Sequence, residues 1–204
     1  MSGAQPLNFV KTLPPEEAAR ADFYGVIARL FYAAPDEQLI SELQLGSSDP
    51  SDVSALAIAW RAMIEGCRTA FPAALRDEHT VLFVGTGRSE ISPYLSKYLA
   101  RHSNDSPLVA LRQLLDSWGV ARREGVVEYE DHIAGVCETM RFAIAVQQRS
   151  AEDQKLLFDR FLYRGGSAFC SAVNASKEAR FYRLVANFAQ AFFDIEKTAF
   201  EMVG

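Results

Sequence analysis

The chain has 204 residues, of which 49% are hydrophobic and 23% are charged, a composition typical of globular proteins. This length is enough for one large domain or two small ones. The formal net charge of -5 argues against a protein that binds nucleic acid through the phosphates, because such proteins carry basic surfaces. The same charge suits a partner that carries a few positive charges.

The N-terminal residues and the cysteines predict a cytoplasmic protein. Cys67, Cys137 and Cys170 are far apart and form no CxxC, so neither a zinc ribbon nor a disulfide framework is predicted. Residues 1–11 show no basic region followed by an apolar run, so we expect no signal peptide. No apolar stretch approaches the roughly 20 residues that cross a bilayer, so we expect no stable membrane insertion. A reducing compartment is therefore indicated.

The first half of the chain is predicted to be helical after a flexible tail at residues 1–13. Pro14-Pro15-Glu16-Glu17 is typical of a helix start, because proline fits the first helical position and acidic residues favour the N-terminal turn. The helices expected next are a short one between Pro35 and Gly46, one over residues 53–71 and one from Pro72 towards Phe83.

The second half of the chain repeats this pattern of helices and breaks. Helices are expected from Ser96, from Ser106 to Gly119, from about Glu128 to Arg149, over residues 151–163, and after Ser176, a good N-cap. Gly165-Gly166 is predicted to interrupt the helical pattern. No alternating run is long enough to predict a strand. The fold class is therefore predicted to be all-α, a single compact bundle of about eight to ten helices over residues 14–204. Five side chains are expected in its core: Trp60, Leu114, Met140, Phe188 and Phe192.

An acidic group with a histidine is the most distinctive stretch of the chain. Glu128, Glu130, Asp131 and His132 lie within five residues, just before an apolar stripe with helical spacing. We expect the acids in the first turn of that helix, where the helix dipole favours negative charge. One interpretation is a well-capped helix start. The other is a functional group, because a histidine beside carboxylates can titrate near neutral pH.

The other motifs do not by themselves predict a nucleotide site, a metal site or a catalytic nucleophile. Gly85-Thr86-Gly87 lacks the third glycine of a dinucleotide-binding loop, and no GK[ST] follows it, so a sharp turn is the preferred interpretation. No Glu-x-x-His pair predicts a metal site, because Tyr129 stands three residues before His132. No GxSxG signature predicts a serine nucleophile.

Two stretches in register resemble the TorD-like (TorD/DmsD/NarJ-type) family of redox-enzyme maturation chaperones. The first is Leu82-Phe83-Val84-Gly85-Thr86-Gly87, followed by Pro93-Tyr94-Leu95-Ser96-Lys97-Tyr98. The second is Glu128-x-Glu130-Asp131-His132-Ile133-Ala134, and Arg180-Phe181-Tyr182-Arg183-Leu184 also resembles the last helix of the family. The resemblance covers residues 15–196, nearly the whole chain.

The resemblance implies a cytoplasmic chaperone without catalytic activity. Its partner would be the immature catalytic subunit of a molybdoenzyme, bound at the twin-arginine signal peptide or another part and held until the molybdenum cofactor is inserted. We expect no cofactor in the chain itself; weak GTP binding has been attached to the family, and the glycine pattern adds little support for it. The expected state is a monomer or homodimer. The candidate peptide-binding residues are Gly85, Gly87, Pro93, Tyr94, Ser96, Tyr98, Glu128, Glu130, Asp131 and His132.

Two further expectations follow. The residues 85–98 loop and the start of the Glu128 helix should lie close together, although about 40 residues separate them, because they are the two most distinctive stretches of the chain. A second class of function stays open, namely a small helical enzyme that uses Asp131 and His132 as an acid–base pair.

Overall fold

The computed structural model describes residues 12–46, 49–85, 89–99, 106–122, 125 and 127–203, so residues 1–11 of the predicted tail lie outside it. Within the described residues the regular structure is helical, and the β pairing is confined to one bridge between Tyr94 and His132. The all-α prediction is confirmed. The helices are α1 (Pro15–Tyr32), α2 (Glu37–Gln44), α3 (Ala55–Thr69), α4 (Pro72–His79), η1 (Thr80–Val84), α5 (Ser96–Leu99), α6 (Pro107–Ser117), α7 (Ile133–Ala145), α8 (Ala151–Leu157), η3 (Phe158–Gly166), α9 (Ser167–Ala175) and α10 (Phe181–Val203).

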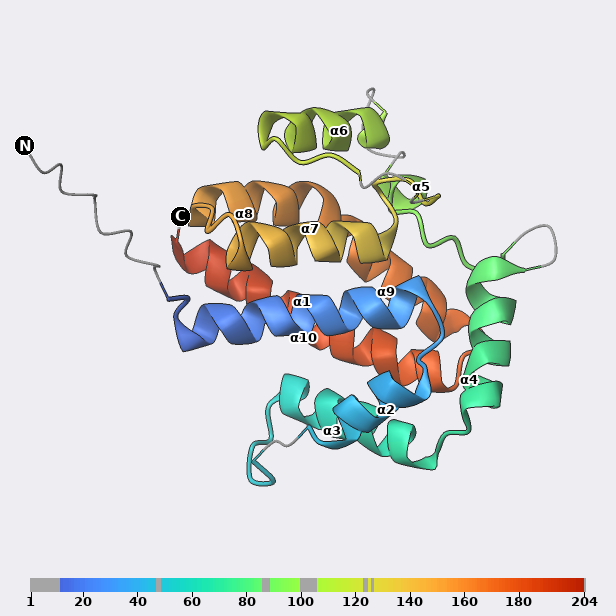
Figure 1. Cartoon of the computed structure of the whole chain (residues 1–204). Coiled ribbons are helices and arrows are strands. Elements are labelled where there is room, and N and C mark those ends of the chain that lie inside the picture. The colour runs from blue at the N-terminus through green and yellow to red at the C-terminus, as the bar shows by residue number, and fades with distance from the viewer. Residues whose placement is uncertain are drawn as a thin grey trace, which may run out of the picture.

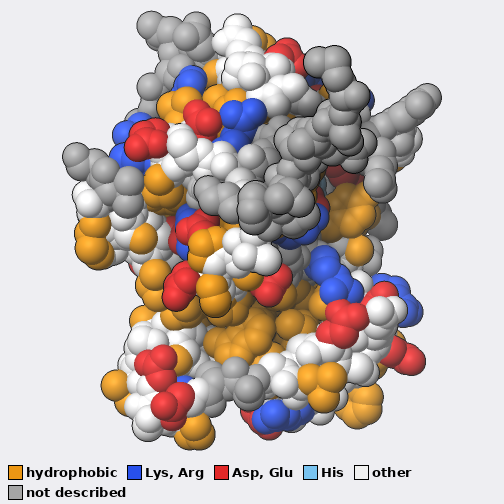
Figure 2. Space-filling model, turned by 60° about the vertical axis from the view of Figure 1, so that its left-hand side comes forward, with side chains coloured by type: hydrophobic (Ala, Val, Ile, Leu, Met, Phe, Trp, Pro, Cys, Tyr) orange, Lys and Arg blue, Asp and Glu red, His pale blue; other side chains and the backbone are white. Residues whose placement is uncertain are grey.

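The two π-helices η1 and η3 are continuous with the α-helices beside them. Because η1 continues α4 and η3 links α8 to α9, the described residues form nine continuous helical stretches, within the predicted number. Figure 1 shows α1 running alongside α7, with α10 packed against α3 and α9. None of the helices in the described ranges is both long and apolar enough to span a membrane. Figure 2 shows acidic and basic side chains mixed over one face, with hydrophobic side chains exposed between them.

One continuous apolar core lies between these helices. Leu114, Met140, Phe188 and Phe192 are buried, as predicted. Trp60 is partly buried and packs against this core. Its ring lies at the edge of the core, with centroids 5.1 Å from Phe188 and 5.5 Å from Phe23.

The predicted break at Gly165-Gly166 is wrong. The backbone continues through η3 into α9, and both glycines are buried. A Cβ on Gly166 would lie 2.9 Å from the ring of Phe193, and one on Gly165 would lie 3.1 Å from the Cβ of Leu95. The glycines therefore serve the close approach of α10 and α5, because only a residue without a side chain leaves this space.

The start of α10 is capped by a distant residue and not by Ser176. The backbone N–H groups of Arg180, Phe181 and Tyr182 donate to the Glu78 carboxylate at 2.8, 3.2 and 2.8 Å. The Ser176 hydroxyl accepts the Glu178 N–H, at 3.1 Å, which lies before α10. The first N–H groups of a helix have no partner within the helix, and here α4 supplies an anion for them.

A buried ion pair joins α1 to α10. Glu196 is 2% exposed, and its two carboxylate oxygens accept from Nε and Nη2 of Arg20 at 2.7 and 2.8 Å. The hydroxyl of Tyr24 donates to the same carboxylate at 2.8 Å. Burial works against the charged form of Arg20, but the hydrogen bonds and attraction of Glu196 outweigh it, so the pKa of the guanidinium is raised.

Candidate functional site

The two distinctive stretches of the sequence lie side by side, which confirms their predicted proximity. The Leu95 N–H donates to the Asp131 carbonyl, and the Ile133 N–H donates to the Pro93 carbonyl, both at 2.8 Å. This short antiparallel pairing, centred on Tyr94 and His132, joins the segment before α5 to the segment before α7.

The acidic group precedes α7 and does not form its first turn, so that prediction was wrong. Helix α7 begins at Ile133, and His132 is the N-cap, with φ -59° and ψ 133°. The physical reason is the pairing with Pro93 and Leu95, which holds His132 in a non-helical conformation directly before Ile133. The Nδ1 atom of His132 accepts the Ala134 N–H at 3.2 Å and so satisfies one of the free N–H groups of α7.

Asp131 is buried and faces α5. Its side chain accepts the Ser96 N–H at 3.2 Å, and the residue is only 4% exposed. The carboxylate thus supports the start of α5, whereas the capping interpretation had assigned it to α7.

His132 is 5% exposed and has a defined tautomer. Because Nδ1 accepts a hydrogen bond, the neutral ring carries its proton on Nε2, which has no hydrogen-bond partner within the described part of the chain. Burial lowers the pKa of His132 below the usual value, and this outweighs the opposite influence of Glu128 and Asp131. The ring is therefore a neutral N–H donor at neutral pH.

This protonation state predicts how stability depends on pH. In the unfolded chain His132 should titrate near pH 6.5. Its folded pKa is lower, so its contribution is complete above about pH 6.5 and is lost as the pH falls through the folded pKa. His132→Asn keeps a capping oxygen and should lose less unfolding free energy than wild type between pH 7.5 and 5.5, measured by urea denaturation. Burial also lowers the pKa of His79, but His79 contributes equally to the pH dependence of stability in wild type and in the variant. An equal or larger loss in the variant would contradict the assignment.

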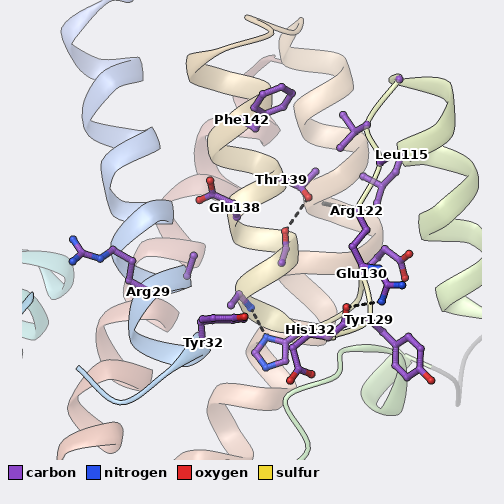
Figure 3. Close-up of a pocket in the computed structure, with 17 residues that line it drawn as sticks. Arg29, Tyr32, Leu115, Arg122, Tyr129, Glu130, His132, Glu138, Thr139 and Phe142 are labelled. Atoms are coloured by element: carbon purple, nitrogen blue, oxygen red, sulfur yellow. Dashed lines mark hydrogen bonds between the residues drawn. The ribbon is translucent and has the colours of Figure 1, made fainter. Parts of the chain in front are cut away.

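An open cleft of about 690 Å³ adjoins His132. Its walls are the end of α1, one face of α7, and the end of α6 with the segment that follows it, as Figure 3 shows. The lining residues are Ala28, Arg29, Tyr32, Leu115, Gly119, Val120, Ala121, Arg122, Glu128, Tyr129, Glu130, His132, Ala134, Gly135, Glu138, Thr139 and Phe142. The cleft therefore combines apolar side chains with three carboxylates, a composition that suits a segment with both apolar and cationic groups.

The cleft brings together only three of the predicted site residues, namely Glu128, Glu130 and His132. Most of the others lie behind them: Tyr94 donates its hydroxyl to the Glu128 carboxylate, and Tyr98 donates to the Ser92 carbonyl at 2.9 Å. Pro93, Ser96 and Asp131 belong to the backbone pairing and to α5, and Gly85, at φ 64°, ends η1. Gly87 lies outside the described residues.

Sequence reasoning missed the α1 wall and most of the α7 wall. Arg29 and Tyr32 come from α1, and Gly135, Thr139 and Phe142 come from α7. The α7 residues recur at intervals of three and four and so share one helical face, a signal that the sequence contains. No spacing in the sequence links α1 to this face.

The carboxylates of the cleft already have partners. Nε and Nη2 of Arg112 donate to Glu130 Oε2 at 3.1 and 2.9 Å. Glu138 pairs with Arg141 on the same helix, at 2.7 Å from Nε. Burial tends to raise the pKa of Glu130, but the hydrogen bond and attraction of Arg112 prevail and lower it. Glu130 and Glu138 thus each accept a guanidinium group, whereas the Glu128 carboxylate accepts the Tyr94 hydroxyl.

Comparisons with known proteins agree with this architecture. The sequence model of the family described as nitrate reductase delta subunit matches residues 48–193. The fold is similar to the crystal structure of a protein from Archaeoglobus fulgidus that is proposed to be a redox enzyme maturation protein, with a TM-score of 0.55 and 17% identity. That alignment covers 93% of this chain and 99% of the other. The comparison with curated proteins found no match. Since the family model covers well over half of the sequence, the chain belongs to the nitrate reductase delta subunit family, the NarJ/TorD-type family of redox-enzyme maturation chaperones.

Proposed function

We propose that this chaperone binds the twin-arginine signal peptide, or another segment, of an immature molybdenum-cofactor oxidoreductase. It would hold this client in the cytoplasm until the cofactor is inserted. The observation that carries the proposal is the cleft between α1 and α7, because its wall holds apolar side chains and the carboxylates of Glu128, Glu130 and Glu138.

The chemistry of the cleft suits such a peptide. A signal peptide offers two adjacent arginines and an apolar stretch, and arginine pairs with carboxylates through two parallel N–H donors. The apolar stretch would be buried against Leu115, Val120 and Phe142, as in other complexes where a peptide lies in an apolar groove. The Nε2–H of His132 could then donate to a peptide carbonyl.

The alternative of an acid–base enzyme receives no support from the geometry. The Asp131 carboxylate accepts from the Ser96 N–H, and His132 Nδ1 accepts from the Ala134 N–H. The two side chains therefore each serve a neighbouring backbone group and do not orient one another.

The test is a calorimetric titration with a signal-peptide fragment in three forms, carrying Arg-Arg, Lys-Lys or Gln-Gln. The Arg-Arg form should bind most tightly. The Gln-Gln form should bind about tenfold or more weakly, because hydrogen bonds between charged groups contribute about 1.5–3 kcal/mol each. The Lys-Lys form should lie between them, because lysine lacks the planar fork. The differences in affinity between the three peptides should become smaller at high salt, because salt screens the charges. Equal affinity for the Arg-Arg and Gln-Gln forms would contradict the proposal.

A further inference from the structure

Glu130 is a cleft carboxylate that already holds a guanidinium. Both contacting nitrogens of Arg112 approach the same oxygen, Oε2, and the Glu130 side chain is 17% exposed. An arginine of the client that approaches Glu130 therefore finds Oε2 already hydrogen-bonded to Arg112.

The Arg112 side chain can move away from Glu130 easily, because it is already partly exposed to solvent. Arg112 lies on α6, is not part of the cleft wall, and has a side chain 43% exposed. Exposed ion pairs contribute little to stability, because solvent screens them and ordering two long side chains costs entropy. In contrast to Arg20, which is held in the bundle by Glu196, Arg112 can swing into solvent when another guanidinium arrives.

The geometry points to Arg112 as an internal competitor for the arginines of the client. This inference rests on the proposed function and deepens it, because it names the step that regulates access to the cleft. In the free protein Arg112 neutralises Glu130, so only a ligand that offers a guanidinium in its place recovers the ion pair on binding. Ligands with apolar groups alone would leave Glu130 bound to Arg112 and gain nothing from the exchange.

A competitor reduces the apparent affinity by a factor equal to the fraction of molecules in which the competitor is not bound. Arg112→Ala should therefore tighten binding of the Arg-Arg peptide about two- to fivefold, the range that corresponds to an exposed ion pair. Arg68→Ala is the matched control, because Arg68 forms an exposed pair with Glu65 on α3, away from the cleft, and it should leave the affinity unchanged.

A second pair of variants separates competition from a general effect of charge. Competition acts through Glu130, so in a Glu130→Gln background Arg112→Ala should give no tightening. Tightening that persists in that background would overturn the inference, and so would unchanged or weaker binding by Arg112→Ala alone. If wild type binds the peptide and Arg112→Ala does not improve it, only this inference fails. If neither wild type nor Arg112→Ala binds the peptide, the proposed function fails as well.

Discussion

Glu196→Ala is expected to lower the free energy of unfolding by about 3 kcal/mol. Removing one partner of a buried pair leaves the other charge without compensation, at a typical cost of about 3–5 kcal/mol. The lower end of that range applies because the Arg20 side chain is 22% exposed and keeps a second contact with Glu17 at 2.7 Å. The Tyr24 hydroxyl, which is fully buried, would also lose its acceptor.

The measurement is urea unfolding of the variant beside a control on the same helix. Glu201→Ala removes an exposed carboxylate that lies 3.8 Å from Lys197 and should change stability by less than about 0.5 kcal/mol. Replacing both Arg20 and Glu196 with apolar residues of similar size should cost less than Glu196→Ala alone, because no unpaired charge remains. If Glu196→Ala were as mild as the control, the pair would not hold α1 to α10.

Thr139→Arg is expected to weaken binding of the Arg-Arg peptide at least about tenfold. Thr139 lines the cleft between Gly135 and Phe142 on α7, so the new side chain would fill space and place a positive charge where the client brings two. Like charges brought together at an interface cost several kcal/mol, and tenfold corresponds to about 1.4 kcal/mol. Folding should be little affected, because the Thr139 hydroxyl bonds only to the Gly135 carbonyl of its own helix, at 2.8 Å.

Thr198→Arg is a closely matched control. Thr198 is exposed on α10, makes the same kind of bond to the Asp194 carbonyl at 3.0 Å, and does not line the cleft. Both variants add one arginine to an α-helix, so calorimetry on the two separates a local effect from a change in net charge. Wild-type affinity in Thr139→Arg would place peptide binding outside the cleft.

Much of the helical order could be predicted because local residues determine it. Pro15, Pro72 and Pro107 all stand at the start of their helices, where the missing N–H costs nothing. Gly119, at φ 67°, follows the end of α6, in a conformation that favours glycine. The proximity of Pro93 and Ile133 could not be predicted from local residues. It was predicted mainly from the resemblance to a known family.

What the sequence by itself determined was the all-α class, most of the helix starts and the apolar faces that form the core, since each depends on residues within one or two turns. Tertiary structure alone decided which groups meet across the fold. Glu78 caps a helix about 100 residues away, Gly165 and Gly166 admit neighbouring helices, and Asp131 supports α5 while His132 caps α7. The cleft has the same origin, because its α1 wall adjoins α7 only after packing. In the same way, unpaired N–H groups donate to whichever acceptor the packing brings near them.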